Sequence, residues 1–368
     1  MTPASAMRLR LVADDLTGAL DTAARFAADA PVPVYWEPPR AVAGAVAIDS
    51  GTREMPREAA RARVAAIAAA LPKDPDALFY AKLDSLLRGH AAAEIAAWIG
   101  ALRPAACLIA PAFPYQGRIT RDARQIARDG DAWAPVPADL AADLADEGLI
   151  VQRRRAGETA PTGISLWDAE TDADLAAIAA AGRALPGPVL WCGSGGLAAA
   201  LAGSAPADGG LPAALPRPLL GLFGTDHPAT AAQLAACGAP VIPPSAGDVA
   251  ARLFSEGLAL VRSSLPAGLS RETAARRIAA AFADLANHLP PPATLLVSGG
   301  ETLRALCGAL AARRLDLTGQ ILPGIPRAVL RGGRWDGVGV VSKSGAFGAP
   351  ELLRDLLFPT PKRKEASR

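Results

Sequence analysis

The sequence predicts an α/β protein of two domains, each with a largely parallel sheet flanked by helices, and a cleft between them. Short β-rich runs alternate with longer Ala- and Leu-rich runs, which is the pattern of parallel strands joined by crossover helices. The chain has 368 residues, which is too long for one ordinary core and suits two. Apolar residues make up 51% and charged residues 20%, the balance of a globular chain.

The first half shows the alternation most clearly. A strand is expected at residues 9–13, followed by a helix at about 18–28. The pattern weakens at 122–160, where charged and Pro-containing segments predict a flap or an irregular edge. The other strands expected here are 45–48, 77–83, 107–110, 163–167 and 189–191, with helices at 57–71, 91–102, 172–181 and after Gly196.

A stretch rich in Gly, Pro, Ala and Ser at 203–218 has the composition of an interdomain linker. We place the boundary after Pro212, which gives an N-terminal domain 1–212 and a C-terminal domain 213–368. The alternation then resumes, with strands expected at 219–223, 294–297 and 337–342 and helices at 229–236, 271–289 and 302–313.

Several classes of protein are disfavoured by composition. The net charge of +2 gives no electrostatic case for nucleic acid or an anionic membrane. The four cysteines are far apart and suggest neither a zinc site nor a disulfide framework, which fits a reducing cytoplasm. The uncharged run 184–207 is interrupted by prolines and by glycines, so a buried strand, turn and helix is expected rather than a membrane span. The partner is expected to be a small molecule.

Polar residues gather where the first strands end, which is where open α/β sheets bind ligands. Asp14 and Asp15 stand together between the first strand and its helix; one of them could serve only as a helix cap, but a cap does not require two. Lys82, Asp84 and Arg88 follow another strand, and the structural alternative there is a local ion pair. Together with Arg53 they supply cations to bind a carboxylate and an aspartate to accept a proton.

Further glycine turns follow other strands. Residues 111–118 form a Pro- and Gly-containing turn that could present Arg118. In the second half, the Gly299–Gly300 turn leads from an apolar strand into a helix, and free N–H groups at such a turn suit a phosphate. Similar turns lie at 223–228 and at 341–348, the latter with Lys343. Each could be only a tight turn, but three in one domain favour a nucleotide.

Common catalytic signatures are missing. The chain has no G-x-x-x-x-G-K-[ST] loop, no protein-kinase set and no G-x-G-x-x-G fingerprint. It has three histidines and no G-x-S-x-G elbow, which makes hydrolase and histidine-metal chemistry weak alternatives. Transfer driven by carboxylates remains.

Read in order, these turns resemble the four-carbon acid sugar kinase family, which includes 3-oxo-tetronate, threonate and erythronate kinases. The family's Ala-Asp-Asp-Leu-Thr-Gly-Ala is similar to residues 13–19, its Lys-x-Asp-Ser-x-Leu-Arg-Gly to 82–89, and its Pro-Ala-Phe-Pro-x-x-Gly-Arg to 111–118. The resemblance continues through 167–172, 191–198, 298–302, 323–326 and 343–348. The motifs occur in the right order over most of the chain apart from about 122–160.

The resemblance implies an acid-sugar-binding N-terminal domain, an ATP-binding C-terminal domain, and transfer of the γ-phosphate to the terminal (4-) hydroxyl. Mg²⁺ should accompany the ATP, held mainly by phosphates, water and one carboxylate. A homodimer is compatible with it. The substrate-binding residues expected are Asp14, Asp15, Arg53, Lys82, Leu83, Asp84, Ser85 and Arg88. The nucleotide-binding residues expected are Thr225, Ser298, Gly299, Gly300, Glu301, Thr302 and Gly345. Asp84 or Asp15 is expected to accept the proton and Lys343 to stabilise developing charge.

Three positions depart from the family pattern. Leu86 stands where the family usually has Thr, His227 lies in a turn that is commonly Ser-rich, and Gln320 matches a frequent Glu. These changes bear on the identity of the substrate more than on the reaction class. The alternatives left open are a catalytically degenerate sugar-acid-binding protein and another sugar-phosphate enzyme, such as an isomerase.

Overall fold

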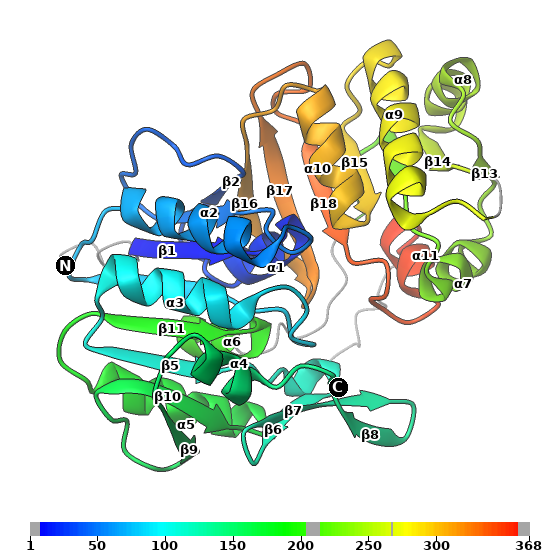
Figure 1. Ribbon diagram of the computed structural model, residues 1–368. Coiled ribbons are helices and arrows are strands. Elements are labelled where there is room, and N and C mark those ends of the chain that lie inside the picture. Colours follow the sequence, from blue (N-terminus) through cyan, green and yellow to red (C-terminus); the bar gives the residue numbers. More distant parts are fainter. Residues whose placement is uncertain (1–7, 204–213, 266–267, 360–368) are drawn as a thin grey trace, which may run out of the picture. The chain divides into compact units, whose positions relative to one another are not determined.

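A computed structural model describes residues 8–203, 214–265 and 268–359 (Figure 1). The chain divides into two compact units, Met1–Ala205 with Leu317–Gly319, and Pro206–Asp316 with Gln320–Arg368. Most of the expected linker and the predicted boundary after Pro212 lie outside the described residues.

The N-terminal unit is built on a parallel sheet with strand order β2-β3-β1-β4-β11-β5-β10-β9. Two groups of helices cover it (Figure 1): α2 packs against α3 and α3 against α4, while α1 packs against α6 and α6 against α5. The strands are β1 Arg8–Ala13, β2 Val32–Tyr35, β3 Val46–Asp49, β4 Ala77–Lys82, β5 Ala106–Ala110, β9 Val151–Arg155, β10 Gly163–Asp168 and β11 Val189–Gly193. The helices are α1 Leu16–Arg25, α2 Arg57–Ala70, α3 Ala91–Leu102, α4 Leu140–Asp146, α5 Asp172–Arg183 and α6 Gly195–Ala202.

The central strands of this sheet are apolar on both sides because helices cover both faces. In β4, Phe79 packs edge-on against Trp98 of α3, with ring centroids 6.4 Å apart, while Tyr80 points to the other face and donates its hydroxyl proton to the carbonyl of Ser194. This explains why β-rich runs without polar alternation were recognisable as strands. The predicted α/β class is confirmed.

The segment predicted as irregular is more regular than the sequence indicated. It contains the strands β7 Arg124–Asp129 and β8 Ala132–Pro135, which form a three-stranded antiparallel sheet with β6 Arg118–Arg121 just before the segment, followed by α4 and the edge strand β9. The short strands β6 and β7 have charged side chains beside a few buried ones such as Ile119 and Gln125, and β8 is exposed throughout. Such strands lack the apolar run that marks a buried parallel strand.

The C-terminal unit has strand order β13-β14-β12-β15-β18-β17-β16, parallel from β13 to β18 and antiparallel between β17 and β18. In register, Phe223 pairs with Ser298 and Ser298 with Lys343, so these three strands end level with one another. The strands are β12 Leu219–Phe223, β13 Val241–Ile242, β14 Leu258–Arg262, β15 Thr294–Ser298, β16 Arg314–Leu322, β17 Ile325–Arg331 and β18 Gly339–Lys343. The helices are α7 Pro228–Cys237, α8 Ala246–Glu256, α9 Arg271–His288, α10 Gly300–Ala309 and α11 Leu352–Leu357.

The uncharged run that raised the question of a membrane span contains β11, a turn and α6, as predicted. Within the residues that the structure describes, no helix combines the length and the apolar character needed to cross a bilayer.

Candidate active site

Three loops meet at the carboxyl ends of β1, β3 and β4 in the N-terminal unit. Ala13 is in register with Asp49 on one side and with Lys82 on the other, so the residues that follow each strand emerge side by side. The sequence-predicted carboxylates and cations of the first half are therefore brought together, as expected for a parallel sheet.

Arg53 binds both members of the aspartate pair. Its Nε and Nη2 donate to the two carboxylate oxygens of Asp14 at 2.8 and 2.7 Å, and its Nη1 donates to Asp15 at 2.5 Å. Asp15 also caps α1, because its other oxygen accepts from the backbone N–H of Gly18 at 2.8 Å. Asp14 is almost wholly buried, whereas the Asp15 side chain is 27% exposed. Asp15 is thus the member of the pair that a ligand can reach.

Asp84 is held by two arginines. Arg88 donates to both of its oxygens, from Nε at 2.8 Å and from Nη2 at 2.7 Å, and Arg53 Nη2 lies 3.6 Å from its Oδ1. The backbone N–H groups of Leu86 and Arg88 also donate to it, each at 3.2 Å. Arg88 itself is 59% exposed and can exchange this partner for a ligand carboxylate.

Charges decide the protonation of this cluster. Burial opposes ionisation of Asp84, but the hydrogen bonds from Arg88 and the charges of Arg53 and Arg88 outweigh it and lower the pKa of Asp84 well below its usual range. Burial raises the pKa of Asp14 against the opposing charge of Arg53. A carboxylate with so low a pKa is a weak proton acceptor, so Asp84 can act as a base only if one of its arginines turns away.

The remaining residues predicted for this site differ in their exposure to a ligand. Lys82 is buried, and its Nζ donates to the carbonyl of Leu83 at 2.7 Å; among the described residues it has no carboxylate within ion-pair distance. The side chain of Leu83 lies in the hydrophobic core, so only its backbone serves the loop. Ser85 is half-buried, and its carbonyl accepts from Gln125 Nε2 at 2.9 Å. Burial lowers the pKa of Arg118, and the negative charge of Asp84 opposes this shift.

In the C-terminal unit, Lys343 is buried at the end of β18, with 1% of its surface exposed. Its Nζ donates to the hydroxyls of Thr230 at 3.2 Å and Ser298 at 3.3 Å, and Thr230 donates to the carbonyl of Gly345 at 2.7 Å. No carboxylate of the described chain pairs with it, and burial lowers its pKa to about 8. A buried cation with only neutral partners is suited to receive an anion.

Three glycine-containing turns of the C-terminal unit lie close to one another beside Lys343. Gly299 caps α10 with φ of +110°, which favours glycine, and Gly300 begins the helix. A Cβ on Gly345 would lie 2.5 Å from Thr225 Oγ1, and one on Gly224 would lie 2.0 Å from Thr302 Oγ1. These contacts bring together the three turns that follow β12, β15 and β18. Glu301 is exposed in the first turn of α10, beside the buried Thr302.

Sequence analysis missed residues that support both clusters. Thr230 and Gln233 of α7 are fully buried, and Gln233 Nε2 donates to the carbonyls of Phe347 and Gly348, each at 2.9 Å, which holds the turn after Lys343. Ser50, Thr52 and Glu94 form a buried chain beside Asp14, with Glu94 as the one charged residue of α3. The sequence signal for this chain was Glu94, a single acidic residue in a helix that is otherwise uncharged.

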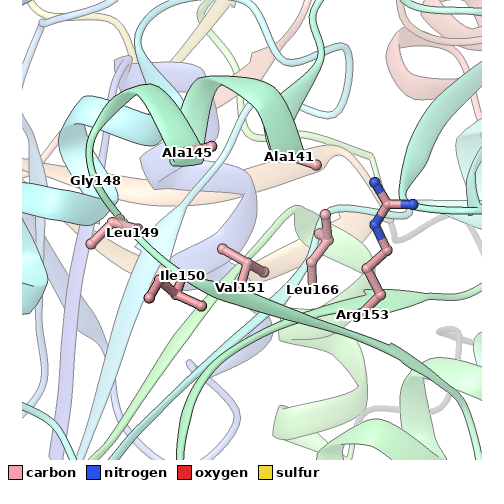
Figure 2. A pocket seen from close by; sticks show the side chains of 8 residues that line it. All are labelled: Ala141, Ala145, Gly148, Leu149, Ile150, Val151, Arg153 and Leu166. Carbon is pink, nitrogen blue, oxygen red and sulfur yellow. The ribbon is translucent and has the colours of Figure 1, made fainter.

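Two other features do not coincide with these clusters. No group of three or more His, Cys, Asp or Glu residues in the described ranges could hold a metal by itself. A pocket of about 390 Å³ opens between α4 and β9, and none of the predicted site residues lines it (Figure 2). Its lining is mainly apolar, with Arg153 as the one charged side chain.

Comparison with known proteins covers both halves. A family model described as a sugar-binding N-terminal domain matches residues 9–141, and one described as a nucleotide-binding C-terminal domain matches 255–353. A D-threonate kinase of Cupriavidus necator is 34% identical, over 93% of this chain and 95% of the relative. A D-threonate kinase of Salmonella typhimurium is 26% identical, over 96% of this chain and 98% of the relative.

Solved structures share the fold. A crystal structure of a Salmonella typhimurium LT2 protein superposes with a TM-score of 0.73 at 19% identity, covering 94% of this chain and 98% of the other. Haemophilus influenzae protein HI1011 superposes with a TM-score of 0.67 at 20% identity, covering 93% and 98%. At these identities the likeness concerns the fold alone.

Proposed function

Since this chain belongs to the four-carbon acid sugar kinase family, we propose that it transfers the γ-phosphate of ATP to the terminal hydroxyl of a four-carbon sugar acid. The observation that carries the phosphate half of this proposal is the buried Lys343, which has hydroxyl and carbonyl groups around it and no carboxylate partner in the described chain. A polyphosphate would supply the missing negative charge, and the backbone N–H groups at the start of α10 would add to its binding.

The sugar acid is assigned to the N-terminal cluster. Arg88 is exposed enough to bind the substrate carboxylate in a bidentate way, and Lys82 is a buried cation without an ion pair among the described residues. Arg53 already contacts three carboxylates, so it is better suited to orient Asp14 and Asp15 than to bind the substrate carboxylate. If the substrate carboxylate replaces Asp84 as the partner of Arg88, the carboxylate of Asp84 becomes free to approach the substrate hydroxyl.

In the reaction, the hydroxyl oxygen forms a bond to the γ-phosphorus and the bond from that phosphorus to the bridging oxygen of ADP breaks. The hydroxyl proton passes to Asp84 or to Asp15. The Asp15 side chain is partly exposed to a ligand, and Asp84 becomes accessible when a ligand displaces it from Arg88. Lys343 would stabilise charge on the phosphates. Mg²⁺ would be held mainly by the phosphates and water, with Glu301 as its one proposed protein ligand. Assembly as a homodimer is part of this proposal and can be tested by light scattering.

The test is ADP release from Mg²⁺-ATP with a panel of four-carbon acids that contains D-threonate, erythronate and 3-oxo-tetronate. We expect one acid to stimulate ADP release and to gain a phosphate on its terminal oxygen, which phosphorus NMR of the product would locate. Lys343→Met should abolish the stimulation. Binding of an acid without any turnover would support the alternative of a degenerate sugar-acid sensor, and turnover of a sugar phosphate without ATP would favour an isomerase.

A further inference from the structure

Glu94 is a buried acid that the proposed reaction does not use. It lies in the first turn of α3, whose other residues are uncharged, and 6% of its surface is exposed. No arginine or lysine of the described chain lies within ion-pair distance of it, which is unusual for a buried carboxyl group. Its hydrogen-bond partner among the described residues is the hydroxyl of Thr52, 2.6 Å from its Oε1.

A short chain of oxygen atoms runs from Glu94 to the end of β1. Thr52 Oγ1 lies 2.8 Å from Ser50 Oγ, and Ser50 Oγ lies 2.8 Å from the carbonyl oxygen of Ala13. All four residues are buried, so no bulk water competes for these contacts. The chain therefore contains three oxygen–oxygen contacts of hydrogen-bond length.

Counting protons determines the charge of Glu94. A carbonyl has no proton, so Ser50 must donate to Ala13, and Thr52 must then donate to Ser50. With both hydroxyl protons used, the contact between Thr52 and Glu94 needs a proton from the acid. If Glu94 were ionised, Thr52 would donate to it instead, and the Ser50–Thr52 contact would be two oxygen atoms 2.8 Å apart with no proton between them.

The environment of Glu94 agrees with this count. Burial raises its pKa to about 7, and the negative charge of Asp14 acts in the same direction. A hydrogen bond that Thr52 would donate to the ionised carboxylate and the charge of Arg53 oppose the shift. The other elements that pack on α3 are α2, α4, β4 and β11, and no charged group on them in the described chain contributes to it.

The same chain links the segments that carry the acid-binding cluster. Thr52 directly precedes Arg53, and Ala13 directly precedes Asp14. The backbone N–H of Ser50 also donates to Ala13 at 2.8 Å, and that of Arg53 donates to Asp14 at 3.2 Å. Displacing Thr52 would therefore shift Arg53 relative to the two carboxylates it binds.

We propose that Glu94 is a protonated positioning residue, which holds Arg53 and Asp14 in register through Thr52 and Ser50 and weakens sugar-acid binding when it ionises. The part concerning the sugar acid rests on the proposed function; the protonated state of Glu94 does not. The two parts can be tested separately.

The protonated state is tested by thermal unfolding of the full chain across pH. Glu94→Gln keeps a donor at this position and cannot ionise. Because the folded pKa of about 7 is above the ordinary 4.5, the carboxyl group favours folding most at low pH, and this advantage disappears as pH rises from about 4.5 to about 7. The melting temperature of the wild type minus that of Glu94→Gln should therefore fall across this window and stay constant above it.

Glu147→Gln is the matched control. The Glu147 side chain is also shielded from solvent, with 2% of it exposed, but its carboxylate pairs with Arg57 and Arg61, so a neutral amide should lower the melting temperature near neutral pH. If Glu94→Gln loses as much stability as this control and its difference from the wild type does not vary with pH, Glu94 is ionised and the proposal is wrong.

The positioning role is tested by calorimetry with D-threonate and, separately, with ATP. The wild type should bind the acid more weakly as pH rises through about 7, whereas Glu94→Gln should show a flatter profile. Thr52→Val should weaken acid binding by about tenfold at any pH, Thr52→Ser should restore it, and ATP affinity should not change. Identical pH profiles for wild type and Glu94→Gln would refute the role; a wild type that binds no four-carbon acid at any pH would refute the proposed function instead.

Discussion

Replacing Lys343 by Met should make the ligand-free protein more stable while it weakens ATP binding. The lowering of the lysine pKa from 10.5 to about 8 means that burial disfavours the charged ammonium by about 3 kcal/mol. Met has a similar length and no charge, so it removes this penalty. It also removes the hydrogen bonds to Thr230 and Ser298, a loss of about 1 kcal/mol each. The free energy of unfolding near pH 7 should therefore rise by about 1 kcal/mol.

The pH dependence identifies the cause. A lysine whose folded pKa is lowered destabilises the fold fully below about 8, and the penalty disappears as pH rises to 10.5. Chemical denaturation of both proteins should show an advantage of Lys343→Met that shrinks over this range. Calorimetry should show ATP affinity reduced by about 10- to 100-fold, the usual loss for a charge-assisted hydrogen bond.

Lys82→Met is the control, because Lys82 is also buried but belongs to the N-terminal unit. It should leave ATP affinity unchanged and weaken binding of the sugar acid. If Lys343→Met is less stable than the wild type at pH 7 and binds ATP with unchanged affinity, Lys343 is an ordinary core residue and the assignment of the phosphate site is refuted.

Three further predictions concern the two clusters. Asp84→Asn should lower kcat by about two to four orders of magnitude with ATP affinity retained; an unchanged kcat would remove Asp84 from the mechanism. Gly300→Val should abolish ATP binding but preserve the fold, because Gly300 has a helical backbone conformation. Gly299→Ala, by contrast, should lower the melting temperature, because the φ of Gly299 is +110°. A folded Gly300→Val protein that binds ATP normally would contradict the nucleotide assignment. Arg53→Lys cannot keep the paired bonds to Asp14, so KM for the sugar acid should rise in steady-state assays, and an unchanged KM would argue against a role in binding.

Much of the fold could be predicted because buried parallel strands and amphipathic helices have strong local patterns. The strand at residues 219–223 and the helix at 91–102 have the predicted bounds, and most others differ by one to three residues. Most elements that were not predicted are short, half-exposed or paired antiparallel: β2, β6, β7, β8, β9, β13, β16, β17, α4, α8 and α11. The burial of such elements depends on the neighbours that cover them, which a local pattern does not reveal. The buried parallel strand β14 was also missed.

The sequence by itself determined which residue types stand at the ends of the strands, and hence that an acid-binding cluster and glycine turns for phosphate could form. Only the tertiary structure decided how those residues pair. Arg53 meets Asp14 across 39 positions of the chain, and Lys343 meets Thr230 across 113. Such pairs set the burial and charge of each group, so they decide that Asp84 is held ionised and that the pKa of Glu94 is raised to about 7. Burial and charge come from neighbours distant in the chain, and for that reason protonation could be derived only from the folded protein.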